Sequence, residues 1–104
     1  MHIKIKNKTA IIYFETDQRY ANHIAIIDEM VHLVQHRFKT FVFDFSGLEI
    51  GFNSTVSGFL LGVVRKLLEC GCDIVIQNIS NTDREVLELI GIKEIDGKIS
   101  IKSL

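Results

Sequence analysis

The chain has 104 residues, of which 47% are hydrophobic and 24% charged, and its twelve basic side chains nearly balance thirteen acidic ones. A chain of this length predicts one domain, residues 1–104, that buries about 65% of its unfolded surface. The balanced charge excludes a nucleic acid or an anionic membrane bound by bulk electrostatics. The longest apolar run, Gly58 to Val64, is far shorter than the roughly 20 residues of a membrane span. Two closely spaced cysteines, Cys70 and Cys72, predict free thiols and a cytoplasmic location.

The first half of the chain predicts a hairpin, a helix and a central strand. Alternating Ile3 and Ile5, a turn at residues 7–8 and the apolar residues 10–14 indicate an N-terminal antiparallel pair. Residues 40–45 are almost continuously apolar, which is typical of a central strand covered on both faces and paired in parallel. Between these strands, apolar residues recur at the spacing of an amphipathic helix: Tyr20, Ile24, Ile27, Val31 and Val34.

The second half of the chain alternates helices with strands. The predicted elements are a helix from Asn53 or Ser54 to Gly71, a strand at 73–77, a helix from Ser80 or Asn81 to Gly91, and a short strand at 98–102. The resulting order is ββαβαβα(β). Because single helices separate the later strands, we expect a small α/β sheet with a parallel centre and an N-terminal antiparallel pair.

Sequence motifs for catalysis are absent. The chain has no glycine-rich phosphate loop, CxxC pair, HExxH motif or GxSxG elbow. His32 and His36 stand four residues apart and could hold a metal, but a solvated helix face explains them equally well and no third ligand is evident. The segment 70–72 is interpreted as a helix end rather than a redox hook, and Asp44 is expected to bind loop amides. The sequence therefore predicts no enzyme, metal or cofactor.

The most specific pattern lies at the end of the central strand and the start of the second helix. Asp44-Phe45-Ser46-Gly47-Leu48, Asn53-Ser54 and residues 58–61, with residues 71–76 and 86–92 further on, resemble the STAS domain of bacterial anti-sigma-factor antagonists over nearly the whole chain. We align the family's signature serine with Ser54 rather than Ser57, because the spacing to Gly71 then needs no gap.

The resemblance implies a regulatory partner switch. In the family, the unmodified domain binds a serine-kinase anti-sigma factor and so frees the sigma factor, phosphorylation of the signature serine undoes the binding, and a serine phosphatase restores it. Ser54 is the implied phosphoacceptor, and Thr55 and Ser57 are weaker candidates. The implied partner surface comprises Asn53, Thr55, Ser57, Gly58, Phe59, Gly62 and Arg65. Of these, Phe59 borders the apolar side of the helix, and core packing is its more favoured role.

Helical spacing supports an accessible surface beside Ser54. At 100° per residue, one stripe of the second helix carries Ser54, Gly58, Gly62, Arg65 and Glu69, and the opposite, buried arc carries Val56, Leu60, Val63, Val64 and Leu67. Two exposed glycines cost helix stability, about 1 kcal/mol each relative to alanine. Either a partner approaches closely at these positions, or crowding inside the domain excludes a side chain.

Two other function classes remain open. The chain is alternatively a structural STAS subunit of a scaffold or lipid-transport assembly with no phosphorylation cycle. Asn53 and Val56, which replace the family's aspartate and glycine, favour that alternative. A small enzyme or nucleotide-binding domain fits the α/β class, but no group of residues supports it.

Overall fold

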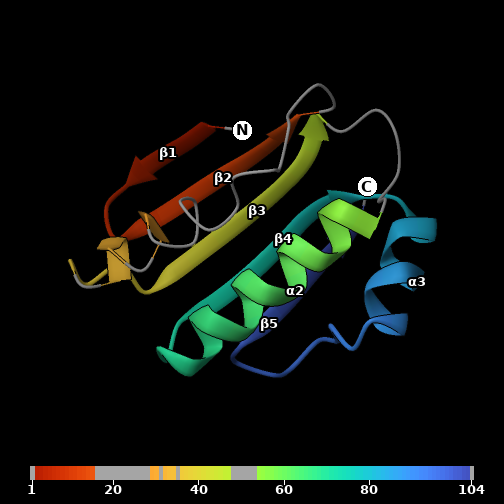
Figure 1. The fold of residues 1–104 in the computed structure, drawn as a ribbon. Helices are drawn as coiled ribbons and strands as arrows, with labels where there is room; N and C mark the ends of the chain where they lie inside the picture. The colour runs from red at the N-terminus through yellow and green to blue at the C-terminus, as the bar shows by residue number, and fades with distance from the viewer. Residues whose placement is uncertain (1, 16–28, 31, 35, 48–53, 104) are drawn as a thin grey trace.

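The computed structural model describes residues 2–15, 29–30, 32–34, 36–47 and 54–103. Their elements are β1 (His2–Lys6), β2 (Thr9–Glu15), β3 (Thr40–Gly47), α2 (Ser54–Glu69), β4 (Asp73–Ile79), α3 (Asn81–Leu89) and β5 (Ile99–Ser103). Figure 1 shows their arrangement. Residues 29–30 and 32–34 are also helical, which confirms the described end of the helix predicted before β3. Four residues of its predicted apolar stripe, Tyr20, Ile24, Ile27 and Val31, lie outside the described residues.

The described strands form one mixed sheet in the order β1-β2-β3-β4-β5. β1 pairs antiparallel with β2, and the predicted turn between them places Asn7 in the left-handed region at φ 57°. β2, β3, β4 and β5 pair in parallel. The mixed α/β sheet, its antiparallel N-terminal pair and the final strand are thus confirmed.

The strand order decides which face of the sheet the helices cover. The two crossovers that contain α2 and α3 each move one strand in the same direction, and crossovers are right-handed, so these two helices lie over the same face. Figure 1 shows α2 and α3 on one side of the sheet, and Met30 is buried in the core on that side. The prediction that residues 40–45 are covered on both faces is therefore wrong for the described elements, and Val42 on the other face is only half-buried.

The core lies between the sheet and the helices. Alternate residues of the central strands point into it, among them Ile12, Phe43 and Ile76, each completely buried. The ring of Phe14 stacks on that of Phe45 with centroids 4.5 Å apart. The predicted buried arc of α2 is confirmed, since none of its members is more than 2% exposed: Val56, Leu60, Val63, Val64 and Leu67.

Local signals set the ends of the helices. Gly71 and Gly91, which follow α2 and α3, have φ of +79° and +94°, a conformation that terminates helices and favours glycine. Ser80 caps the N-terminus of α3, where its Oγ accepts a hydrogen bond from the Asp83 amide at 3.1 Å.

Candidate functional site

The implied phosphoacceptor, Ser54, is the first residue of α2. The helix starts at the edge where the parallel strands end and runs back along the sheet (Figure 1). Backbone amides in the first turn of a helix lack helical partners and favour a nearby anion. No acidic residue lies in the first turn of α2, so a phosphate on Ser54 would bring negative charge to a turn that has none.

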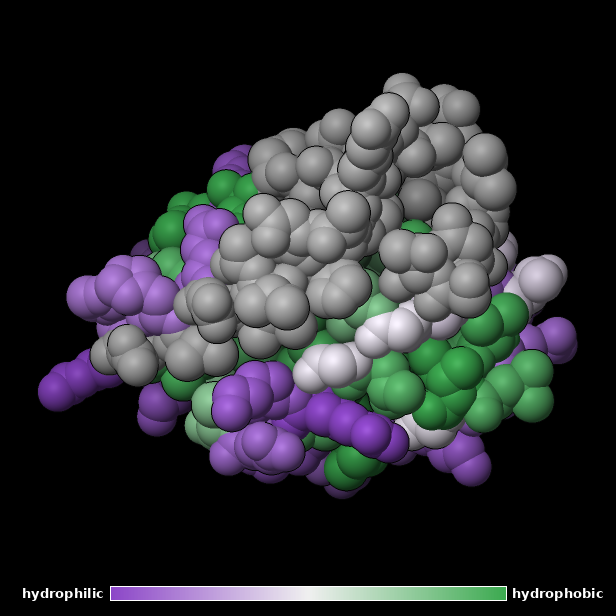
Figure 2. Space-filling model, in the orientation of Figure 1, coloured by the Kyte–Doolittle hydropathy of each residue, from purple (hydrophilic) through white to green (hydrophobic). Residues whose placement is uncertain are grey.

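The outward stripe of α2 is open near Ser54. Gly58 and Gly62 are exposed, and a Cβ added to either glycine would meet no described atom within 4 Å. Crowding among the described residues therefore does not explain these two glycines. Figure 2 views the helix side and shows a pale band of intermediate hydropathy over α2, with hydrophilic surface towards its C-terminal end.

The other predicted contact residues divide into three groups. Arg65 is exposed and Ser57 half-buried, so both reach the surface. Asn53 lies outside the described residues, and Thr55 is placed only as part of α2. The prediction that Phe59 belongs to the partner surface is corrected, because this side chain is only 3% exposed and its ring meets that of Phe14 edge-on, with centroids 5.9 Å apart. Core packing is its role.

A cluster of polar side chains lies at the edge of the sheet where the parallel strands end and α2 starts. Asp44 is only 4% exposed although it lies on the face opposite the helices. Its Oδ1 accepts hydrogen bonds from the amide and the hydroxyl of Ser46 at 2.9 and 2.6 Å. Its Oδ2 accepts from the side-chain amides of Gln77 and Asn78 at 2.8 and 2.9 Å. The expected loop-amide contact of Asp44 is confirmed, and two partners come from β4, which sequence reasoning missed.

These four hydrogen bonds keep Asp44 ionised. Burial alone raises the pKa of the carboxyl group, but hydrogen bonds from Ser46, Gln77 and Asn78 to its charged form outweigh burial and hold the pKa below its usual value. Because Ser46 belongs to β3, and Gln77 and Asn78 belong to β4, the cluster ties these two strands together. The available sequence signal was the pair of polar residues Gln77 and Asn78, which follows the apolar residues 74–76 of β4.

The remaining candidate chemistry is weak. The rings of His32 and His36 meet edge-on with centroids 4.4 Å apart, but no group of three His, Cys, Asp or Glu side chains among the described residues could hold a metal. Both cysteines are free, Cys70 exposed and Cys72 buried, and burial raises the pKa of the Cys72 thiol. Neither pair gathers further reactive groups in the described part of the chain.

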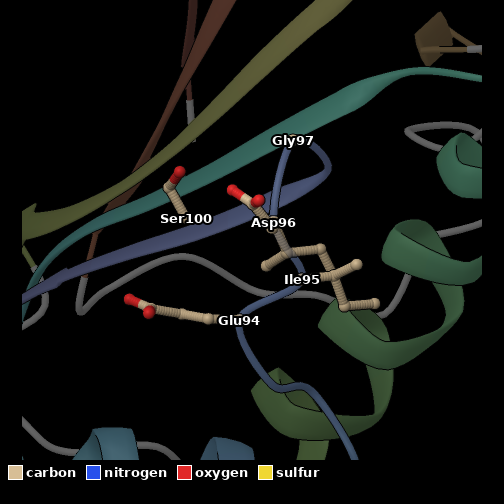
Figure 3. A pocket seen from close by; sticks show the side chains of 6 residues that line it. Glu94, Ile95, Asp96, Gly97 and Ser100 are labelled. Carbon is tan, nitrogen blue, oxygen red and sulfur yellow. The ribbon is translucent and has the colours of Figure 1, made fainter.

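A hollow of about 350 Å³ lies before β5 and is lined by residues 94–97, Ile99 and Ser100. Figure 3 shows the Glu94 and Asp96 carboxylates on the turn that precedes this strand. Glu94 is already engaged, because its Oε1 accepts from Arg84 and from the Ile101 amide, both at 3.2 Å. Glu94 therefore helps to attach the turn before β5 to that strand and to α3.

The comparisons with known proteins support the fold. No protein-family model matches the chain, and no curated protein matches it. Among solved structures, a chain of the stressosome, described as a signal integration and transduction hub, has 22% identity and a TM-score of 0.75, and the match covers 99% of this chain and 89% of that one. A serine-to-glutamate variant of RsbS from Moorella thermoacetica has 20% identity and a TM-score of 0.76, with 98% and 88% covered.

The Bacillus cell fate determinant SpoIIAA in its phosphorylated form also matches, with 18% identity, a TM-score of 0.70, and 96% of this chain and 88% of that one covered. The chain thus has the STAS fold of anti-sigma-factor antagonists, as the sequence resemblance implied. None of the helices in the described ranges combines the length and hydropathy needed to cross a membrane.

Proposed function

We propose that this chain is a regulatory, non-enzymatic protein-binding domain that works as a partner switch of the anti-sigma-factor-antagonist type. The observation that carries the proposal is the outward stripe of α2, where Ser54 opens the helix and two exposed glycines leave room for a partner. Glycines in an exposed helix lower its stability, so their presence suits a surface that another protein approaches closely.

The proposed partner is a serine kinase that is also an anti-sigma factor. In the unmodified state this kinase binds along the first three turns of α2, over Gly58 and Gly62. The kinase transfers the γ-phosphoryl group of ATP to the Ser54 hydroxyl, and ADP and the hydroxyl proton leave. The phosphate adds about −1.5 to −2 charges at pH 7, which the helix N-terminus tolerates but a closely packed interface does not.

A serine phosphatase would restore the binding state by hydrolysing the phosphoserine. This cycle needs no cofactor or metal from the chain itself. It would take place in the cytoplasm, a reducing compartment in which an exposed free thiol such as that of Cys70 persists. The solved structure of phosphorylated SpoIIAA shares the fold, which lends support to a phosphoacceptor here.

The test is intact-mass analysis after incubation with the candidate kinase and ATP. We expect the mass of one phosphate on the wild type and on Ser57→Ala, none on Ser54→Ala, and weaker kinase binding after modification. A phosphate that persists in Ser54→Ala would contradict the assignment of the acceptor.

A second experiment tests the open helix surface. Gly62→Leu fills the space on the outward stripe and should weaken kinase binding at least about tenfold while the fold is kept, since a Cβ at this exposed position meets no described atom within 4 Å. Glu69→Leu adds the same side chain to the last turn of α2 and is the matched control. Equal binding by both variants would remove α2 from the interface.

The alternative function is a constitutive structural subunit of a larger assembly. The match to a chain of the stressosome favours it specifically. Such a subunit binds its neighbours irrespective of phosphate on Ser54. Stable binding to a partner that neither Ser54→Asp nor Ser54→Ala alters would therefore favour the structural subunit over the switch.

A further inference from the structure

The face of the sheet opposite α2 and α3 is a second surface with a distinct chemistry, and we call it the helix-free face. The strand register aligns its side chains in rows that cross all five strands. One row consists of Lys4, Ile11, Val42, Val75 and Ser100, and the next includes Tyr13, Asp44, Gln77 and Lys102. The three central strands thus place Ile11, Val42 and Val75 side by side.

An uncovered parallel sheet is unusual. Parallel sheets occur almost only with both faces covered, because their strands are apolar on both sides. Here Ile11, Val42 and Val75 are only half-buried, whereas their neighbours on the helix side, such as Ile12, are completely buried. The described elements therefore leave an apolar row without a covering layer.

The positive charge on this face lies at its two edges. Lys4 and Lys6 project from β1, and Lys102 projects from β5. No ion pair joins these three lysines to an acidic side chain in the described ranges, whereas Lys98 pairs with Asp73 at 3.8 Å. Asp44 keeps its negative charge, but it presents no free oxygen to an incoming ligand, because each of its oxygens already accepts two hydrogen bonds.

The dimensions of the face match those of a helix. Three neighbouring strands span about 10 Å, which equals the diameter of an α-helix with its side chains. A helix that lies along β2, β3 and β4 would cover the apolar row and have lysines of β1 on one side and of β5 on the other.

We propose that the helix-free face docks an amphipathic α-helix of a partner protein, with the apolar stripe of that helix on Ile11, Val42 and Val75 and its acidic flanks towards Lys4 and Lys102. This surface lies on the opposite side of the sheet from α2. The two surfaces can therefore be occupied at the same time, and the inference does not depend on phosphorylation of Ser54.

The experiment uses two labelled helical peptides of about 18 residues, long enough for stable helicity. Both carry the same leucine stripe, flanked by glutamates in one peptide and by lysines in the other. Fluorescence anisotropy should give at least about tenfold tighter binding of the acidic peptide to the wild type, and Lys4→Glu/Lys102→Glu should invert that preference. NMR shift changes should centre on the amides of Val42 and Val75.

Lys66→Glu/Lys93→Glu is the matched control, because it changes the net charge equally but at exposed positions of α2 and of the segment after α3. It should keep the preference for the acidic peptide, and far-UV circular dichroism should confirm that both double variants are folded. Equal affinity for the two peptides, or an acidic preference that survives in Lys4→Glu/Lys102→Glu, would overturn the proposal.

Two other occupants would also overturn it. One is a second copy of this chain, detected as concentration-dependent dimerisation in sedimentation that Val42→Lys abolishes. The other is a membrane surface, detected as binding to phosphatidylglycerol vesicles that Lys4→Glu/Lys102→Glu abolishes while the acidic peptide fails to bind.

Discussion

On the helix side of the sheet, β3 presents Phe41, Phe43 and Phe45, and on the helix-free face the same strand presents Val42, Asp44 and Ser46. The three aromatic side chains are at most 2% exposed and belong to the hydrophobic core. On the other face, Asp44 is buried almost as deeply, and its carboxylate accepts four hydrogen bonds there.

Two kinds of interaction thus hold β3 in place, one on each of its faces. Apolar burial is strong and non-directional, so it stabilises the helix side without fixing exact partners. Hydrogen bonds to a carboxylate are directional, so the cluster around Asp44 specifies how the ends of β3 and β4 align. The four predictions below test this division of roles, beginning with the largest expected effect.

The two faces of β3 should contribute unequally to the free energy of unfolding. Phe43→Ala removes a completely buried ring and should lower the free energy of unfolding by about 3–5 kcal/mol, because a cavity adds to the lost transfer energy. Val42→Ala, one residue away on the helix-free face, should cost only about 1 kcal/mol. Urea denaturation with an unchanged m-value measures both, and similar losses would show that the helix-free face is covered in solution.

The polar cluster is tested by Asp44→Asn. The amide has nearly the same shape as the carboxylate, but it keeps one acceptor oxygen for four donors, so we expect a loss of about 2 kcal/mol at neutral pH. Amide hydrogen exchange should also accelerate at Ser46. A loss well below 1 kcal/mol would mean that the cluster aligns the strands without stabilising them.

The stability that the Asp44 carboxylate contributes should depend on pH. Because the pKa of Asp44 is lower in the folded protein than its ordinary value of 3.8, its contribution to stability is complete above that value and is lost as the pH falls through the folded pKa. The difference in unfolding free energy between wild type and Asp44→Asn should therefore be constant near neutrality and shrink in acid. Urea titrations from about pH 3 to 7 measure it. A difference that grows in acid would reverse the sign of the shift.

The smallest effect is expected for Asp73→Asn, on the same face but at its exposed end. This carboxylate is 52% exposed and meets the Lys98 ammonium at 3.8 Å. Exposed ion pairs contribute about 0–1 kcal/mol, so the unfolding free energy should change by less than about 1 kcal/mol and the change should vanish in high salt. A salt-independent loss as large as that of Asp44→Asn would show that burial does not separate the two carboxylates.

Local rules made much of this fold predictable. The cap at Ser80, the left-handed glycines 71 and 91, and the buried arc of α2 each follow from residues within a few positions of one another. The burial of Phe59 did not follow from local spacing alone, because this residue lies at the border of that arc. It also depends on Phe14, 45 residues earlier in the chain, whose ring meets that of Phe59.

Other features depend on how distant segments meet. That α2 and α3 cover the same face follows from the strand order, which the pattern of residues 40–45 does not encode. Two of the partners of Asp44, Gln77 and Asn78, come from β4. Gln77 lies opposite Asp44 in the β3–β4 register. Asn78 has φ 60° and lies where the pairing between β4 and β5 shifts. At the candidate site, the sequence indicated the helix, the serine and the open glycines, but not this cluster at the same edge.

The sequential order of the strands has a consequence for how the protein folds. Each strand pairs with the one that precedes it in the chain, so no pairing requires two distant ends of the sequence to meet. Closing short loops costs less chain entropy than closing long ones, and local contacts speed folding. We expect the sheet to grow from β1 outwards as the chain emerges from the ribosome, with each new strand adding to an edge that already exists.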